Sequence, residues 1–96
     1  MITRNTIINE YFSKNMKGEY TSVESLVKRL SKTQLIQIAK NDCIFYRSNW
    51  SKQELFDRVL QSIAHVVYGI ECCNVKNDYE SIQEFCSRIY MKYFNE

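Results

Sequence analysis

The chain offers few side chains that could carry out catalysis. His65 is its only histidine, and it falls in the apolar run of the longest expected helix, where a core-edge histidine is the ordinary role. Cys43 has no further histidine to serve as its base, and its neighbours resemble no protease signature. The pair Glu54 and Asp57 has a spacing typical of helix capping and solvated surface. No phosphate loop, dinucleotide fingerprint or metalloprotease motif occurs, so we expect a non-enzymatic protein with no catalytic residue.

The cysteines do not indicate a metal centre either. Four occur in the chain, at Cys43, Cys72, Cys73 and Cys86. Structural zinc needs four Cys or His ligands, usually with a Cys-x-x-Cys pair, and the sequence contains neither that pair nor a second histidine. The adjacent cysteines are poorly placed for a disulfide. We therefore expect free thiols, mostly buried as small apolar side chains, with no metal and no cofactor.

Basic residues are concentrated in the first half of the chain. Residues 1–52 hold nine Lys or Arg against four Asp or Glu, whereas residues 53–96 hold four against seven. Cationic side chains bind phosphate groups, and aromatic rings stack on bases. The candidate residues for binding nucleic acid or another partner are Lys28, Arg29, Lys32, Lys40, Tyr46, Arg47, Trp50 and Lys52. The alternative is an ordinary mixed surface, because dedicated DNA-binding proteins are far more basic.

Helices must position these residues. Proline is absent and only two glycines occur, at Gly18 and Gly69, which favours long uninterrupted helices. The apolar spacing predicts one all-α domain over residues 1–96, a small bundle of four to five helices. The expected helices cover residues 3–16, 21–30, 31–40 and 51–70, and a last helix begins between residues 78 and 81. A Glu three residues after a Ser or Thr predicts capping boxes at Thr21, Ser51 and Ser81.

Two of the expected helices carry pronounced apolar faces. The helix from residue 51 is broadly apolar through Leu55 and Val59, and we expect it to be central to the core. The last helix has an apolar stripe made of Ile82, Phe85, Ile89 and Tyr93. This stripe belongs either to the core of the domain or to the interface of a helical homodimer.

Residues 41–50 break the helical period and form the longest connection. Ile44, with Phe45 as the second choice, is expected to plug the core from this loop. Three other side chains of the loop then have no internal role: Tyr46, Arg47 and Trp50. Exposed aromatics beside an arginine make an efficient contact surface. The alternative is that Trp50 packs on Leu55 as a hydrophobic staple and is structural.

Residues 26–63 form a recognisable pattern. A helix capped by Ser31 precedes the loop, and the next helix opens with Lys52-Gln-Glu-Leu-Phe-Asp-Arg-Val59. This arrangement resembles the helix–extended loop–helix modules of the SAP and HeH domains and of the N-terminal module of the Rho termination factor. In those families a loop residue, here Ile44, plugs the module. The resemblance implies nucleic-acid association, with Lys52 and the N-terminus of the second helix near the phosphate backbone.

Two functions follow from these observations. The first is a small nucleic-acid-associated protein that contacts the phosphate backbone through the basic helix–loop–helix module. The second is an inhibitor or adaptor from a phage or mobile element, of the anti-CRISPR or host-takeover type, that binds a host protein. An abundance of isoleucine, asparagine, lysine and tyrosine is typical of an AT-rich genome and suits the second function, as do tyrosines that can anchor a protein interface.

The N-terminal residues do not predict export. Residues 1–4 are followed by polar residues rather than by the apolar core of a signal peptide. No window approaches the ~20 apolar residues of a membrane span. We therefore expect a cytoplasmic protein, in a bacterial or phage-infected host cytosol, with no membrane partner.

Overall fold

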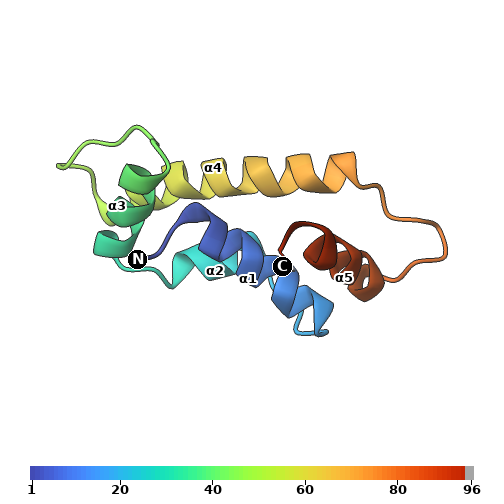
Figure 1. Cartoon of the computed structure of the whole chain (residues 1–96). Coiled ribbons are helices and arrows are strands. Elements are labelled where there is room, and N and C mark those ends of the chain that lie inside the picture. The colour runs from blue at the N-terminus through green and yellow to red at the C-terminus, as the bar shows by residue number, and fades with distance from the viewer. Residues whose placement is uncertain (95–96) are drawn as a thin grey trace.

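The computed structural model describes residues 1–94. Within that range the chain forms five α-helices and no strand (Figure 1): α1 (Arg4–Met16), α2 (Val23–Lys28), α3 (Lys32–Asn41), α4 (Lys52–Cys73) and α5 (Ile82–Tyr93). The prediction of a small all-α bundle of four to five helices is confirmed. Two expected bounds are corrected, because α2 is shorter than residues 21–30 and α4 continues beyond residue 70 to Cys73.

Every helix begins after a hydroxyl side chain that accepts a backbone hydrogen bond. The N-cap residues are Thr3, Ser22, Ser31, Ser51 and Ser81. Such caps satisfy backbone N–H groups that have no acceptor within the helix. The N-caps at Ser51 and Ser81 were predicted, and each accepts a hydrogen bond from the backbone N–H of the Glu three residues later. The predicted capping boxes are wrong, because neither Glu side chain returns a bond to the cap backbone among the described residues; complete boxes occur at Thr3 and Ser31 instead.

The cap of α2 is Ser22 rather than the predicted Thr21, because Asn15 holds the backbone of Thr21. The Thr21 N–H donates to Asn15 Oδ1 over 3.2 Å, and Asn15 Nδ2 donates to the Thr21 carbonyl over 3.4 Å. Gly18 allows the tight turn that brings these groups together, since its φ is +84°, in the left-handed region that favours glycine. The buried Asn15 therefore sets where the second helix begins.

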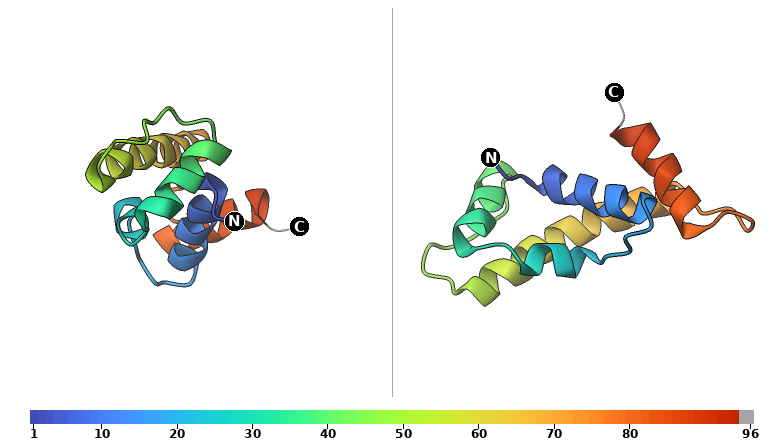
Figure 2. Two further views of the ribbon diagram at one scale, coloured as in Figure 1. Left: turned by 90° about the vertical axis from the view of Figure 1, so that its left-hand side faces the viewer. Right: turned by 90° about the horizontal axis from the view of Figure 1, so that it is seen from below.

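The five helices share one elongated core. Helices α1, α2 and α3 pack against α4, and α5 packs on α1. Figures 1 and 2 show α3 and the loop that follows it at one end of the molecule, with the α4–α5 connection at the other. The principal extents are 48 × 24 × 22 Å. The largest fully buried side chains are Phe12, Ile7, Leu35, Ile38, Leu55, Ile63, Ile89, Val27 and Val59.

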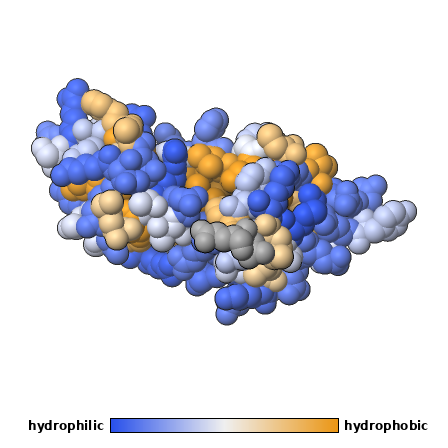
Figure 3. Space-filling model, in the orientation of Figure 1, coloured by the Kyte–Doolittle hydropathy of each residue, from blue (hydrophilic) through white to orange (hydrophobic). Residues whose placement is uncertain are grey.

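Helix α4 buries one face only. Its buried residues recur every fourth position, at Leu55, Val59, Ile63 and Val67. His65 is exposed, because it lies two residues past Ile63 and therefore ~200° around the helix. The prediction of a core-edge histidine is wrong. On the face drawn in Figure 3, apolar side chains gather along the seam between α4 and the helices below it, and most of the remaining surface is hydrophilic.

The apolar stripe predicted on α5 is divided between core and surface. Phe85 and Ile89 are buried in the core of their own domain, together with Cys86. Ile82 and Tyr93, by contrast, are 57% and 46% exposed. The face of α5 that packs on α1 therefore contains Phe85, Cys86 and Ile89, and is rotated about the helix axis relative to the predicted stripe. The four predicted residues therefore do not form one surface on which a homodimer could assemble.

The thiols are more exposed than predicted. Cys43, Cys72 and Cys73 are exposed and only Cys86 is buried, and all four are free. Burial raises the pKa of the Cys86 thiol. The prediction that most cysteines are buried is wrong. Cys72 and Cys73 are the last two residues of α4 and lie beyond its last buried residue, Val67. Among residues 1–94, no helix is long and apolar enough to span a membrane.

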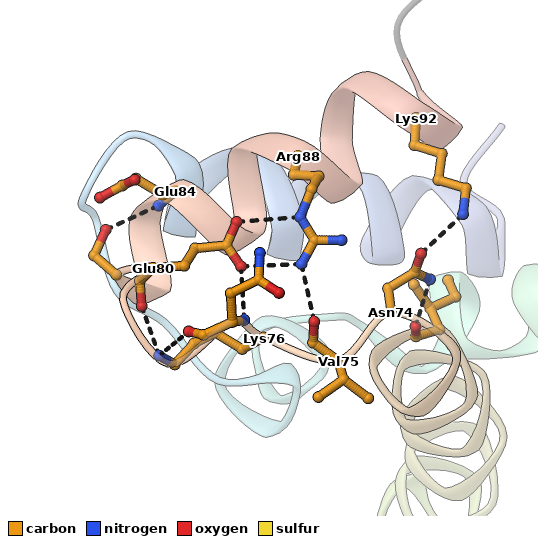
Figure 4. Close-up of polar contacts among 10 residues, drawn as sticks. Asn74, Val75, Lys76, Glu80, Glu84, Arg88 and Lys92 are labelled. Atoms are coloured by element: carbon orange, nitrogen blue, oxygen red, sulfur yellow. Dashed lines mark hydrogen bonds and ion pairs between the residues drawn. The ribbon is translucent and has the colours of Figure 1, made fainter.

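Polar contacts secure the connection between α4 and α5 (Figure 4). Arg88 donates to Glu80 over 2.9 and 3.1 Å and to the Val75 carbonyl over 3.1 Å. The hydrogen bond from Arg88 holds the pKa of Glu80 below its usual value. The buried Asn74 Nδ2 donates to Tyr93 Oη over 3.0 Å, and Asn74 Oδ1 accepts from Lys92 over 2.9 Å. These bonds satisfy the polar groups of a long connection that contributes little to the core.

Candidate functional site

Cations without an acidic partner gather at the end of the molecule formed by α2, α3, the following loop and the start of α4. We call this surface the basic end and define it by Lys28, Lys32, Lys40, Arg47, Lys52 and Arg58. None of these six side chains forms an ion pair with another residue in the described range 1–94. Unpaired cations in water keep their full capacity to bind an anionic partner.

Three predicted binding residues are less available than the other candidates. Arg29 donates to Glu10 of α1 and forms an ion pair with it. Tyr46 and Trp50 are half-buried against the core. Two exposed carboxylates, Glu54 and Asp57, also lie on α4 at this end. The basic end is therefore positive overall, with six cations that have no ion pair among residues 1–94 against two acidic side chains.

A first cleft at the basic end lies beside the N-terminus of α4. It has a volume of about 450 Å³ and is lined by Lys28, Lys52, Gln53 and Phe56. Lys52 and Gln53 are the first two residues of a helix that is 22 residues long. Their backbone N–H groups have no acceptor within the helix, and the helix dipole is positive at this end. Two lysines and a helix N-terminus together favour an anion.

The second cleft lies on the other flank of α4. It has a volume of about 480 Å³ and is lined by Arg4, Asp42, Cys43, Ile44, Phe45, Arg58, Gln61, Ser62 and His65. The Arg4 backbone N–H donates to Asp42 over 2.8 Å, and its guanidinium donates to Ser62 over 2.8 Å. The Arg4 guanidinium also lies 3.9 Å from Asp42. The carboxylate of this cleft is therefore neutralised, and Arg58 is its free cation.

The loop after α3 is held by its turn and by its aromatic residues. Cys43 has a φ of +55° directly after the C-cap of α3, and the Ile44 N–H donates back to the Ala39 carbonyl over 2.9 Å, as in a Schellman turn. Ile44 packs against the core, as predicted. Trp50 also packs against the core cluster, which includes Leu55, so the prediction that it has no internal role is wrong.

Phe45 is the aromatic residue that the loop exposes. Its side chain is 62% exposed, so the prediction that it helps to plug the core is wrong. Its ring meets the Trp50 ring edge to face at 5.8 Å and 77°. The Arg47 guanidinium lies 5.9 Å from the Phe45 ring centroid, and the Arg58 guanidinium lies 5.9 Å from that of Trp50. These four side chains form one surface, which we call the arginine–aromatic cluster.

Two members of this cluster were missed as binding residues. Arg58 appeared only as part of the helix pattern, although it lies ~100° around the helix from the buried Val59 and ~140° from the buried Ile63. That position, away from the centre of the buried face, indicates the solvent face. For Phe45 no periodic signal existed, because a loop residue has no helical face to assign.

We expect Tyr46→Ala combined with Trp50→Ala to destabilise the protein. Both rings are half-buried against the core, so their removal should lower the free energy of unfolding by about 2–3 kcal/mol and the melting temperature by roughly 10 °C. Thermal melts followed by circular dichroism measure this. Phe45→Ala is the matched control and should melt within a few degrees of the parent protein. An unchanged melt for the double variant would contradict the structural role of Tyr46 and Trp50.

The fold and the site together define a small helical bundle with an unpaired basic end. The chain matches no protein-family model, and comparisons with curated proteins and with solved structures gave no match.

Proposed function

We propose that this protein is a non-enzymatic nucleic-acid-associated protein that contacts phosphate groups through its basic end. One observation carries the proposal: six cations that have no acidic partner among residues 1–94 lie on the elements at one end of the molecule, namely α2, α3, the following loop and the start of α4. Such a surface is complementary in charge to nucleic acid. Each contact between a cation and a phosphate releases a condensed counterion, which favours binding.

The arrangement of the clefts supports the same function. Lys28 comes from the end of α2 and Lys52 from the start of α4, and both line one cleft of about 450 Å³. A phosphate in that cleft meets two ammonium groups and the positive end of a long helix. The resemblance of residues 26–63 to SAP-type modules adds weight, since it also assigns phosphate contact to Lys52.

The test is the salt dependence of binding. We expect micromolar binding of DNA or RNA at ~50 mM salt, which falls steeply as salt rises. A triple variant should make this salt dependence weaker: Lys28→Gln, Lys32→Gln and Lys52→Gln combined. Up to about three phosphate contacts are lost, and each contributes roughly 0.9 to the slope of log affinity against log salt for duplex DNA. Fluorescence anisotropy at a series of salt concentrations measures both quantities.

A control separates local contacts from net charge. The combination Lys17→Gln, Lys76→Gln and Lys92→Gln removes the same charge from outside the basic end. This control should keep nearly the full slope. Absence of binding at ~50 mM salt, or an equal loss of slope in both triple variants, would overturn the proposal.

A second candidate function, docking on a host protein as an inhibitor or adaptor, is favoured by exposed apolar side chains at the opposite end. Val75, Tyr79 and Ile82 are 74%, 101% and 57% exposed around the α4–α5 connection. A partner retained from host lysate after nuclease treatment, and lost in Val75→Ser with Tyr79→Ser, would support this function. This second function would be excluded if retention of partners depended on intact nucleic acid and on the basic-end lysines Lys28, Lys32 and Lys52.

A further inference from the structure

Phe45 is a large apolar side chain held in an ordered but open position. Its ring is 62% exposed, while Trp50 contacts it edge to face at 5.8 Å and Arg47 lies 5.9 Å from its centroid. Trp50 itself packs against the core, so it anchors the exposed ring to the rigid part of the molecule. A ring fixed in this way loses little side-chain entropy when a ligand covers it.

The surroundings of Phe45 suit a planar, anionic ligand. The cleft beside it, of about 480 Å³, falls within the range of volumes that bind small organic groups. Arg58 lines this cleft and has no acidic partner among the described residues. Gln61 and Ser62, on the floor contributed by α4, supply hydrogen-bonding groups. The cleft therefore combines a stacking surface, a cation and polar groups that can contact the edge of a base.

The acidic side chains near the cluster restrict the path of such a ligand. Glu54 and Asp57 line a separate cleft with Trp50 and Arg58, so a phosphate chain is repelled from that side. Asp42 is already engaged by Arg4. The favourable path runs past Arg47 and the open face of Phe45, and then toward Arg58.

From this geometry we propose that Phe45 stacks on an unpaired base, so that single-stranded nucleic acid is the preferred ligand of the basic end. The inference rests on the proposed function and specifies its ligand. In a duplex both faces of every interior base are stacked on neighbours, and exposing one costs a few kcal/mol. In a single strand the bases are free to leave the stack and bind an aromatic ring, with arginines contacting the adjoining phosphates.

The experiment compares a labelled single strand of about 12 nucleotides with the blunt duplex of the same sequence, by anisotropy at low salt. We expect the single strand to bind more tightly, and Phe45→Ala to weaken its binding about 10-fold while leaving duplex binding within about 2-fold. Phe45→Tyr should retain binding, because it keeps the ring. Phe45→Leu should lose this binding, because leucine keeps the apolar character but has no aromatic ring on which a base can stack. Tyr68→Ala is the matched control, since Tyr68 is 68% exposed but lies outside both clefts.

Tryptophan fluorescence supplies an independent readout. Trp50 is the only tryptophan of the chain and contacts Phe45, so a base stacked on Phe45 should change its emission in a saturable way that the duplex does not reproduce. Salt-dependent binding with equal affinity for both nucleic acids and no effect of Phe45→Ala would overturn this inference and leave the proposed function standing. Absence of binding by either nucleic acid at low salt would overturn both.

Discussion

Val59→Asp is expected to unfold the protein at room temperature. Val59 is 0% exposed and lies on the one face of α4 that packs against α1, α2 and α3. Among residues 1–94 the only buried polar side chains are those of Asn15 and Asn74, and neither is a cation, so a carboxylate there would be desolvated without a partner. The cost is several kcal/mol, against a total stability of about 5–15 kcal/mol that is smallest in short chains.

Circular dichroism and urea unfolding measure this effect, with Ala64→Asp as the control. Ala64 lies in the same helix but is exposed, so a carboxylate there remains in water and should change stability by no more than about 0.5 kcal/mol. Leu55→Asp, one turn earlier on the buried face, should behave like Val59→Asp. Helical signal and cooperative unfolding that persist unchanged in both core variants would show that α4 is not part of the core.

The second large effect is expected from Phe12→Ala, which removes a buried aromatic ring from the contact between α1 and α5. Phe12 is 0% exposed. Its ring stacks on Phe94 at 6.1 Å and meets Tyr11 edge to face at 5.0 Å. Because α5 packs mainly on α1, the cavity left by the ring should lower the free energy of unfolding by about 3–5 kcal/mol.

The loss should be concentrated in α5. Hydrogen exchange is expected to accelerate most over Ile82–Tyr93, since the remaining ties of this helix include the polar contacts of Asn74 and Arg88. Tyr20→Ala is the control, because Tyr20 is 64% exposed and its removal leaves no cavity. Uniform acceleration along the whole chain would contradict the view that α5 is a separately attached element and would indicate one indivisible cooperative unit.

A tyrosine links α1 to the far half of α4. The Tyr11 hydroxyl donates to Glu71 over 3.1 Å, and burial together with the nearby Glu71 carboxylate raises the pKa of Tyr11. Tyr11 therefore stays neutral and donates this bond across the pH range in which proteins are ordinarily studied. The bond connects α1 and α4 on the side away from the basic end. Glu71 lies beyond Val67, the last buried residue of α4.

The two ends of the molecule have different characters. At the basic end, α3 and the start of α4 carry free cations beside an exposed aromatic ring. At the opposite end, Glu80 and Arg88 pair with each other, and the apolar side chains of Val75, Tyr79 and Ile82 are exposed among polar ones. The proposed nucleic-acid contact and the alternative protein contact therefore fall on separate surfaces, so variants at one end can be tested without disturbing the other.

The helices and their starting points were determined by local sequence alone. An apolar period of three to four residues needs a helix to bring its members onto one face, and a serine cap acts only on the N–H group three residues later. The sequence therefore identified Ser31, Ser51 and Ser81 correctly as N-caps. It also identified five of the six cations of the basic end, because charge is a property of composition, and missed only Arg58.

Tertiary structure decided which side chains are exposed. The sequence predicted a cap at Thr21, but the buried Asn15 engages the backbone of Thr21 and the helix is capped by Ser22. The aromatic residues of the loop have no helical periodicity from which burial could be predicted. In the structure Tyr46 and Trp50 pack against the core, whereas Phe45 is exposed. The face that α5 buries depended on its packing against α1. Burial is a competition among apolar side chains for one limited core, and only the assembled helices determine which of them remain at the surface.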